Sequence, residues 1–511
     1  MTSLVVPSEP TGVLSDAWRT CVGTGRLNLA LRRDHHESLA LAQSEIGFRH
    51  VRGHGLLSDD MGVHRPYDAA GHTGTRYGFS YVDQVFDAWL SLGIRPFLEL
   101  GFMPSGLASG SQTVFWWQGN VTPPRDYREW ADLVQHLVRH AVDRYGLDEV
   151  RRWPIEVWNE PNLTQFWQGA SQEEYFRLYE VTAAAVKDVD PALQVGGPAV
   201  SPGADDWWQP FADFVTDRDV PVDFLSFHAY TAGPAQHVPF GTYQSLRPPE
   251  VLLEQFARPA QLLAGSRLAG LPAHVTEFST SYRPDNPVHD TAYQAAALAP
   301  VLARGGDLVD SFSYWTFCDV FEEEGVPTTM FHGGFGMLGH RQVRKPVFHL
   351  YAFMARMGRD VLQRGADHLV TRGAGGRLTV LAWQPVGGSE APPETDRHAL
   401  RLTLPVGPTA SRVSVHRSRV DEQRGNAFTA WRHLGRPASP TSRQLAVLEE
   451  AAQPERSTTS LPVADGRVEL RIELERHEVT LVEIDVVDDE TPPWLDDARI
   501  LGRAGDPGQG A

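Results

Sequence analysis

The sequence predicts an α/β fold in which a (β/α)8 TIM barrel is followed by a C-terminal β-sandwich domain, and three observations support this prediction. Strand-like and helix-like segments alternate from about residue 21 to about residue 318. Beyond about residue 345 the pattern changes to short alternating strands separated by turns rich in Pro and Gly. The 511 residues are enough for one large barrel and a further domain.

The eight barrel strands are predicted from short apolar runs rich in β-branched and aromatic residues. In chain order they cover residues 21–25, 48–52, 95–101, 154–158, 193–197, 223–228, 273–277 and 311–315. Eight strands alternating with helices favour a closed barrel, and an open doubly wound sheet is the alternative. The sequence weakens that alternative, because Gly23-Thr24-Gly25 lacks the third glycine of a phosphate-binding fingerprint.

Helices are predicted between the strands from a periodicity of about 3.6 residues. In residues 81–90 the apolar side chains at positions 82, 85, 86, 89 and 90 fall on one face. Similar patterns cover residues 127–145, 172–188, 249–263 and 291–303. These helices would form the outer layer of the barrel, which we place at residues 16–345.

The C-terminal third alternates apolar and polar residues with a period of two, which is typical of antiparallel strands. The predicted strands are residues 377–383, 399–404, 413–416, 468–472 and 479–484. A helical insertion is expected near residues 442–451. We assign residues 346–487 to the β-sandwich and residues 488–511 to an acidic tail rich in Pro and Gly.

Composition excludes several classes of partner. The formal net charge of −18 disfavours nucleic acid and anionic membrane surfaces, since both would repel the protein. Only two cysteines occur, Cys21 and Cys318, so neither a disulfide framework nor a zinc cluster is expected. No stretch has the length of a membrane span, and residues 1–9 do not resemble a signal peptide. We therefore expect a cytoplasmic protein.

Two predicted strands end in a glutamate, and this pair indicates chemistry. Glu160 lies in the stretch IEVWNEPN (residues 155–162), where Pro161 stops the strand, and Glu277 ends the strand AHVTE. In an eight-stranded barrel the fourth and seventh strands face each other across the mouth, so their carboxylates can converge. Glycosidases use such a pair as acid and nucleophile. The alternatives are a solvated turn at Glu160 and an arginine-paired structural carboxylate at Glu277.

Other polar or aromatic residues also stand at strand ends, where barrels build their sites. They are Arg52, His54, His228, Tyr230, Trp315, Glu322 and Glu323. Metal catalysis is a competing class, because His50, His54, His228 and His332 are available, but no His-Glu-x-x-His spacing occurs. A thiol nucleophile at Cys318 ranks lower, because no His partner can be assigned to it. We expect no metal and no cofactor.

At several of these positions the sequence resembles the β-xylosidases of glycoside hydrolase family 39, a family that also contains α-L-iduronidase. The resemblance covers roughly residues 16–355 and, more weakly, the C-terminal domain. The matching runs are residues 21–26 (CVGTGR), 51–55 (VRGHG), 158–163 (WNEPNL), 226–230 (SFHAY), 275–278 (VTEF), 311–317 (SFSYWTF), 321–323 (FEE) and 331–336 (FHGGFG). Asn-Glu-Pro alone is shared by many barrel glycosidases, whereas the combined set is far more specific.

The resemblance implies a role for each candidate residue. Glu160 would be the acid/base and Glu277 the nucleophile, and Asn159 would bind the sugar 2-hydroxyl. His228 and Tyr230 would line the pocket for the terminal sugar, Trp315 would form a wall, and Glu322 and Glu323 would hold sugar hydroxyls. It also implies that residues 1–15 add a strand to the sandwich and that the chain forms a homo-oligomer, a tetramer or a dimer.

Two positions depart from the family pattern. Gly53 stands where the xylosidases tend to carry an aromatic residue, and Phe278 stands where they tend to carry Tyr. The leading hypothesis is a retaining exo-β-xylosidase that acts on a small carbohydrate. A family member acting on a β-galactoside, an α-L-arabinopyranoside or a uronide is the second, and a catalytically silent sugar-binding protein is the third. The intact pair of glutamates argues against the third.

Overall fold

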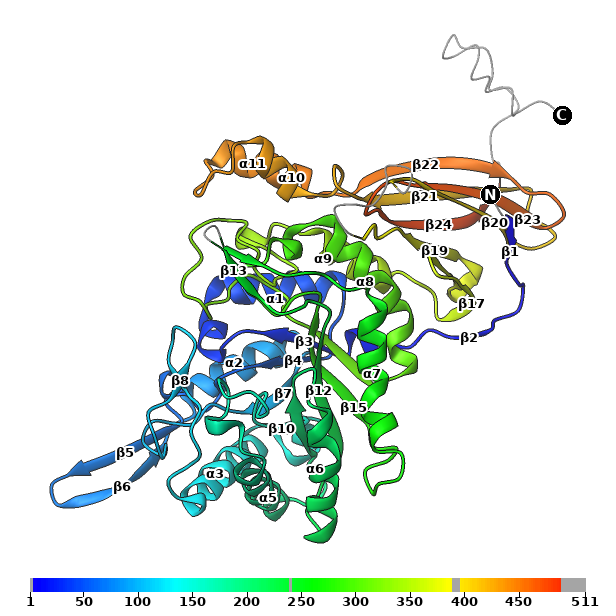
Figure 1. Ribbon diagram of the computed structural model, residues 1–511. Coiled ribbons are helices and arrows are strands. Elements are labelled where there is room, and N and C mark those ends of the chain that lie inside the picture. The colour runs from blue at the N-terminus through cyan, green and yellow to red at the C-terminus, as the bar shows by residue number, and fades with distance from the viewer. Residues whose placement is uncertain (1–2, 239–240, 388–395, 489–511) are drawn as a thin grey trace.

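The computed structural model (Figure 1) describes residues 3–238, 241–387 and 396–488, and its centre is a closed barrel of eight parallel strands. They are β3 (Cys21–Thr24), β4 (His50–Gly53), β7 (Arg95–Leu100), β10 (Ile155–Val157), β11 (Val195–Val200), β12 (Phe224–Tyr230), β15 (Ala273–Ser279) and β16 (Ser311–Tyr314). Strand β16 pairs with β3 through Tyr314 and Val22, which closes the barrel and excludes the open sheet. All eight predicted strands are present, so the barrel prediction is confirmed.

Helices surround the barrel, and each presents an apolar face to it. They are α1 (Arg33–Glu45), α2 (Ser80–Ser91), α3 (Tyr127–Tyr145), α4 (Leu147–Val150), α5 (Gln172–Val189), α6 (Asp205–Asp217), α7 (Glu250–Leu262), α8 (Ala292–Arg304) and α9 (Pro346–Ala355). Helix α3 has the predicted bounds, and Asp126 caps it by accepting a hydrogen bond from the Arg128 amide. Helix α8 is buried on nearly every side, because the barrel and the second domain both pack against it.

The C-terminal region folds into a seven-stranded antiparallel sheet and a three-stranded mixed sheet that enclose one hydrophobic core, as expected for the β-sandwich. The seven-stranded sheet contains β2 (Gly12–Val13), β17 (Asp360–Arg364), β18 (His368–Arg372), β19 (Leu378–Trp383), β24 (Val479–Val487), β21 (Arg412–Val420) and β22 (Glu455–Pro462). The three-stranded sheet contains β1 (Ser3–Val5), β20 (His398–Pro405) and β23 (Arg467–Leu474). In β23 every second residue is buried, which reproduces the predicted alternation.

The two ends of the described chain meet in this sandwich. Strand β1 runs parallel to β20, with Ser3 opposite Arg401, and β2 pairs with β17. The division into residues 1–15, 16–345 and 346–487 stays a prediction. The predicted tail lies outside the described residues except for Asp488.

The helical insertion consists of α10 (Ala427–His433) and α11 (Ser442–Ala451), and it covers part of the barrel. Trp431 and Leu448 from these helices share a hydrophobic cluster with Met330 and Phe331. The latter two lie in the long segment between β16 and α9, here called the strand-eight loop (residues 315–345). The sandwich domain therefore supports a loop at the carboxyl end of the barrel.

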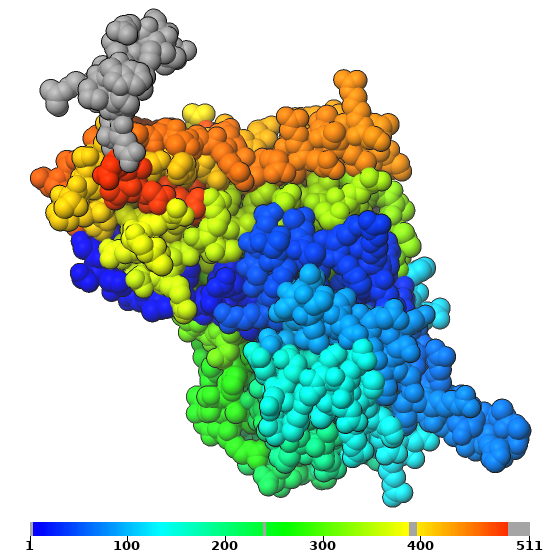
Figure 2. All heavy atoms as spheres, turned by 180° about the vertical axis from the view of Figure 1, so that it is seen from behind, coloured from blue at the N-terminus to red at the C-terminus, as the bar shows by residue number. Residues whose placement is uncertain are grey.

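Short hairpins decorate the barrel. Hairpin β5–β6 (His64–Ala69, His72–Tyr77) projects from the body of the molecule in both views (Figures 1 and 2). Hairpin β8–β9 (Thr113–Val114, Gly119–Asn120) follows β7, and β13–β14 (Gln236–Val238, Gly241–Tyr243) follows β12. Within the described ranges, no helix has both the length and the apolar character needed to cross a membrane.

A buried triad of Lys345, Asp290 and Asp319 anchors the strand-eight loop. Lys345 Nζ lies 2.7 Å from a carboxylate oxygen of Asp290 and 2.7 Å from one of Asp319, and all three side chains are buried. The ammonium also donates to the Gly334 carbonyl at 2.8 Å. Because a buried ion pair left without one partner is strongly destabilising, the triad makes the loop depend on Lys345.

We expect Lys345→Met to lower the free energy of unfolding by about 3–5 kcal/mol, because two buried carboxylates would lose their cation. Urea denaturation followed by circular dichroism measures this change. The control Arg33→Met breaks an exposed pair with Glu37 and should leave the free energy nearly unchanged. A loss for Lys345→Met as small as that of the control would contradict the prediction.

Candidate active site

A cavity with a volume of about 1010 Å3 opens at the carboxyl ends of the barrel strands. Seven of the predicted site residues line it. They are His54, Asn159, Glu160, Tyr230, Glu277, Trp315 and Glu323. Arg52 and His228 lie behind this lining and contact its carboxylates. The barrel thus gathers residues that are far apart in the sequence around one cavity.

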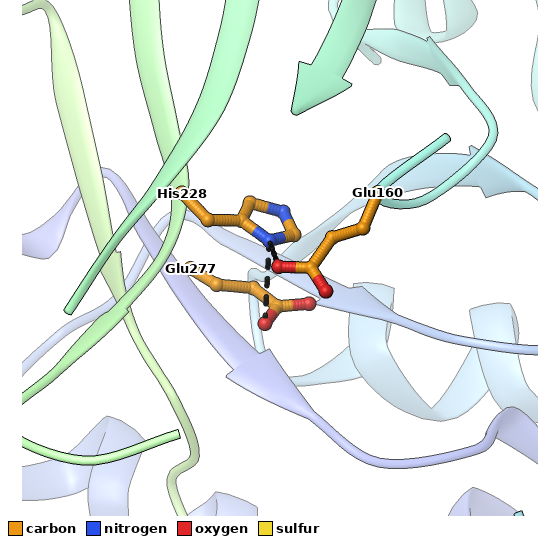
Figure 3. Close-up of side chains that lie close together, drawn as sticks. All are labelled: Glu160, His228 and Glu277. Carbon is orange, nitrogen blue, oxygen red and sulfur yellow. Dashed lines mark hydrogen bonds and ion pairs between the residues drawn. The ribbon is translucent and has the colours of Figure 1, made fainter. Parts of the chain in front are cut away.

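The two candidate catalytic glutamates approach each other closely (Figure 3). One carboxylate oxygen of Glu160, one of Glu277 and a ring nitrogen of His228 all lie within 4.8 Å of one another. Retaining glycosidases hold their two carboxyl groups about 5–5.5 Å apart, whereas inverting enzymes separate them by about 6.5–9.5 Å. The geometry matches the retaining class.

The backbone after β10 is bent so that Glu160 reaches the cavity. Trp158 has φ 72° and Glu160 has φ 45°, both in the left-handed region that non-glycine residues rarely adopt. Two hydrogen bonds hold this conformation. The Trp158 indole N–H donates to the Phe166 carbonyl at 2.8 Å, and the Glu160 amide donates to the Ala199 carbonyl at 2.9 Å. Strained backbone of this kind is common where a side chain must be aimed at a substrate.

The surroundings of Glu160 suit a proton donor. Burial raises the pKa of Glu160 to about 7, although the Arg52 guanidinium acts in the opposite direction. His228 Nδ1 lies 2.8 Å from Glu160 Oε1. Burial lowers the pKa of His228 to about 4, so this imidazole is neutral at neutral pH. Glu160 can therefore carry a proton near pH 7 and exchange it.

Glu277 instead has partners that favour an anion. Arg52 Nη1 donates to Oε1 at 2.7 Å, and the Tyr230 hydroxyl donates to Oε2 at 2.8 Å. The Arg52 guanidinium is fully buried and also donates to Glu156 at 2.6 Å and to Asn159 Oδ1 at 2.9 Å. Because the amide oxygen of Asn159 is held by Arg52, its N–H2 group is the part that can meet a ligand.

His54 and Trp315 form one side of the cavity. Their ring centroids are 4.7 Å apart, and the Arg52 guanidinium lies 5.9 Å from the Trp315 ring. His54 Nδ1 is 2.6 Å from Glu99 Oε2, while Nε2 is 3.5 Å from Glu277 Oε1. Burial lowers the pKa of His54 to about 4, so a neutral ring faces the nucleophile candidate.

The two adjacent glutamates of the strand-eight loop have different surroundings. Glu323 lines the cavity, and burial together with the nearby Glu277 and Glu160 raises its pKa well above the usual range. Glu322 is not part of the lining. Its two oxygens instead accept from Arg26 and Arg32, each at 3.1 Å. The structure thus places Glu323 at the cavity, as was predicted for both glutamates, and Glu322 outside it.

Neither residue that departs from the family pattern borders the cavity. Phe278 packs among Phe256, Phe312 and Tyr314 in the barrel wall. At Gly53, an added Cβ would lie 2.7 Å from the Gly25 carbonyl oxygen, so a larger side chain would not fit without a shift of the backbone. The two departures therefore change the wall of the barrel rather than the lining of the cavity.

Two carboxylates of the network were not predicted from the sequence. Glu99 and Glu156 stand inside strands β7 and β10, where the alternation indicates buried side chains, and both are buried beside Arg52. The sequence feature that could have identified them is an ionisable residue within an otherwise apolar strand. Glu160, His228 and Glu277 could also surround a cation on the criterion of distance alone. Their hydrogen bonds instead fit a proton donor beside a nucleophile.

Comparisons with known proteins show which proteins this chain resembles. The family model of the glycosyl hydrolases family 39 matches residues 2–469. A β-xylosidase of Geobacillus stearothermophilus is 48% identical over 500 residues, which cover 97% of this chain and 98% of the relative. A β-xylosidase of Caldicellulosiruptor saccharolyticus is 34% identical over 469 residues, or 89% of this chain and 92% of the relative. A solved monomeric β-xylosidase from Caulobacter crescentus CB15 superposes with a TM-score of 0.86 and 32% identity, covering 95% of this chain and all of that one.

Proposed function

Because this chain belongs to the glycosyl hydrolases family 39, we propose that it is a retaining exo-β-xylosidase in which Glu277 is the nucleophile and Glu160 the acid/base. It is a glycoside hydrolase, and the two relatives that are 48% and 34% identical to it are β-xylosidases, whereas an α-L-iduronidase that matches 89% of the chain is only 26% identical. The observation that carries the assignment is the close pair of carboxylates, one able to hold a proton and one bound by Arg52 and Tyr230. The substrate would be a terminal β-D-xyloside on a short xylo-oligosaccharide or another xylosylated molecule.

The reaction would take place in two displacements. In the first, a Glu277 oxygen forms a bond to the anomeric carbon while the bond to the leaving oxygen breaks, and Glu160 gives that oxygen its proton. In the second, the Glu160 carboxylate takes a proton from water as the water oxygen attacks the same carbon. The bond between that carbon and Glu277 breaks in the same step, which releases Glu277 as a carboxylate. A pKa near 7 lets Glu160 act in both steps.

We expect clear hydrolysis of nitrophenyl β-D-xyloside and a kcat/KM at least about a hundredfold lower (about 2.7 kcal/mol) on the corresponding α-L-iduronide. A uronate must be desolvated and needs a cation or several donors. Arg52 is already bound to Glu156 and Glu277, and the carboxyl group of Glu323 lines the same cavity. A panel of nitrophenyl glycosides measures this difference.

Two further arginines line the cavity but are occupied. Arg247 donates to the backbone carbonyls of Thr231 and Tyr230, and Arg283 is paired with Glu324.

Equal hydrolysis of the iduronide and the xyloside would overturn the proposed sugar. Activity confined to a β-galactoside or an α-L-arabinopyranoside would keep the mechanism and replace xylose.

We expect kcat/KM on xylobiose to fall about tenfold per pH unit above pH about 7, because Glu160 must be protonated to assist a sugar leaving group. The sign follows from the raised pKa: the active, protonated form is present below it and is lost above it. In Glu160→Ala this fall in kcat/KM at high pH should be absent when an activated dinitrophenyl xyloside is the substrate. If the fall persists unchanged in the variant, the titrating group is not Glu160.

We also propose a cytoplasmic location and assembly into a homo-oligomer, a dimer or a tetramer. The free thiols of the buried Cys21 and Cys318 suit a reducing compartment. The oligomer proposal rests on the family resemblance, and the solved Caulobacter relative is described as monomeric. Light scattering on the purified protein decides between one copy and several.

A further inference from the structure

Glu322, which does not line the cavity, is linked to it through two other side chains. Its Oε2 accepts from Arg26 Nη2 at 3.1 Å, and Arg26 Nη1 donates to Asp60 at 3.0 Å. The Arg26 guanidinium lies 5.8 Å from the ring centroid of Trp116 and 5.7 Å from that of Trp117. A cation held in this way by two carboxylates attracts the faces of both indoles and orients them.

Trp116 is the most exposed tryptophan of the described chain, with 55% of its surface accessible, and it lines the cavity. It stands at the turn of hairpin β8–β9, next to Phe115, which adopts φ 64°. Its backbone amide donates to the Glu323 carbonyl at 2.8 Å. Contacts with Arg26 and the strand-eight loop therefore hold the ring in place, although more than half of it remains open to solvent.

The cavity is lined by two kinds of side chain. The first kind is the titratable groups around Glu160 and Glu277. The second kind is aromatic side chains that none of the proposed catalytic contacts uses, namely Phe115, Trp116, Phe166 and Tyr282, of which Tyr282 is 41% exposed. A volume of about 1010 Å3 is at the upper end for sites that take drug-sized ligands, so a single pentose leaves much of it empty.

We propose that Trp116 is a stacking platform for the leaving-group part of the substrate and that Glu322 is a positioning residue that acts on it through Arg26. The platform takes a flat ring with an apolar face, either a second pyranose or an aromatic ring. This inference rests on the proposed function and specifies its substrate further. It also replaces the sugar-binding role that the family resemblance implies for Glu322.

Trp116→Ala tests the platform with three substrates that share one xylosyl unit: methyl β-xyloside, xylobiose and phenyl β-xyloside. For each substrate the variant is compared with the wild type, so differences in intrinsic reactivity cancel. We expect the fall in kcat/KM on xylobiose, on phenyl xyloside or on both to exceed that on methyl xyloside by at least tenfold. The substrate with the larger loss identifies which kind of ring binds. Trp116→Phe should recover most of the loss.

The matched control is Tyr243→Ala, which removes an aromatic ring that is 56% exposed but does not line the cavity. Its kcat/KM should equal that of the wild type on all three substrates. Equal losses on all three substrates in Trp116→Ala would overturn the platform. A wild-type enzyme that hydrolyses none of the xylosides would overturn the proposed function instead, and the comparison would then use the methyl and phenyl glycosides of the sugar that is hydrolysed.

Glu322→Gln tests the positioning role, because it keeps the shape of the side chain and removes the charge that holds Arg26. We expect a loss on the ring-bearing substrates of about threefold or more and no additional loss when it is combined with Trp116→Ala. The kcat on a dinitrophenyl xyloside, when limited by hydrolysis of the xylosyl-enzyme, should stay near the wild-type value, because the leaving group has then departed. A fall in that kcat, or losses that multiply in the double variant, would show that Glu322 acts on the xylosyl unit itself.

Discussion

Glu277→Ala is expected to lower kcat on nitrophenyl β-D-xyloside by at least about ten-thousandfold, because it removes the atom that forms the covalent bond. Arg52 and Tyr230, which donate to this carboxylate, would remain and would face an empty space. No neighbouring carboxylate can replace the nucleophile, since Glu160 approaches the anomeric carbon from the leaving-group side. Steady-state kinetics on the purified variant measures the loss.

Azide should restore part of the activity of this variant. A small anion fits the space left by the side chain, and Arg52 would attract it. It would attack the anomeric carbon from the side that Glu277 occupied, so the product is the xylosyl azide of inverted, α configuration. Proton NMR of the product distinguishes the two anomers. A β-configured azide would instead indicate that residue 277 is the acid/base, and a loss smaller than about tenfold would contradict its catalytic role.

Glu160→Ala is expected to lower kcat/KM on xylobiose by about a thousandfold while lowering that on a dinitrophenyl xyloside far less. A sugar alcohol needs the proton that Glu160 provides, whereas dinitrophenolate leaves without it. Azide should again produce a xylosyl azide, now with retained β configuration, because it reacts with the xylosyl-enzyme in place of water. These measurements separate the roles of the two glutamates within one substrate series.

The control for both glutamates is Glu149→Ala, which removes a half-buried carboxylate that pairs with Arg95 away from the cavity. This variant should hydrolyse xylobiose and the dinitrophenyl xyloside as the wild type does. Equal losses on xylobiose and the dinitrophenyl xyloside in Glu160→Ala would count against the assignment of this residue as acid/base.

Much of the barrel could be predicted because its strands are short apolar runs with regular spacing. Helix α3 was predicted with the correct bounds, since its apolar residues repeat strictly over five turns. Helices α1 and α6 were not singled out. Helix α1 opens with Arg33 followed by polar residues, and α6 contains Pro210. Proline alone does not explain the second omission, because the predicted helices α7 and α8 also contain one. Packing against the barrel compensates for both features.

The site was predictable to the extent that it lies at strand ends. Glu160 and Glu277 follow from the register of a closed barrel, which brings the ends of strands four and seven together. The hydrogen-bond partners of each side chain could not be predicted from the sequence. Glu322 binds Arg26 and Arg32, which lie 296 and 290 positions away in the sequence, and this turns it away from the sugar site that its neighbour Glu323 occupies. Such contacts depend on tertiary geometry that periodicity does not describe.

The pairing of β1 with β20 has a consequence for how the protein is made. The partner of the first described strand, β1, is translated only after the whole barrel. At about 5–20 residues per second, β1 remains unpaired for about 20–80 seconds. The segment that carries Glu160 and Glu277 is thus translated before the sandwich can close and before α10 and α11 can pack against the strand-eight loop. A nascent chain would contain these two glutamates early and gain the contacts that support the strand-eight loop last.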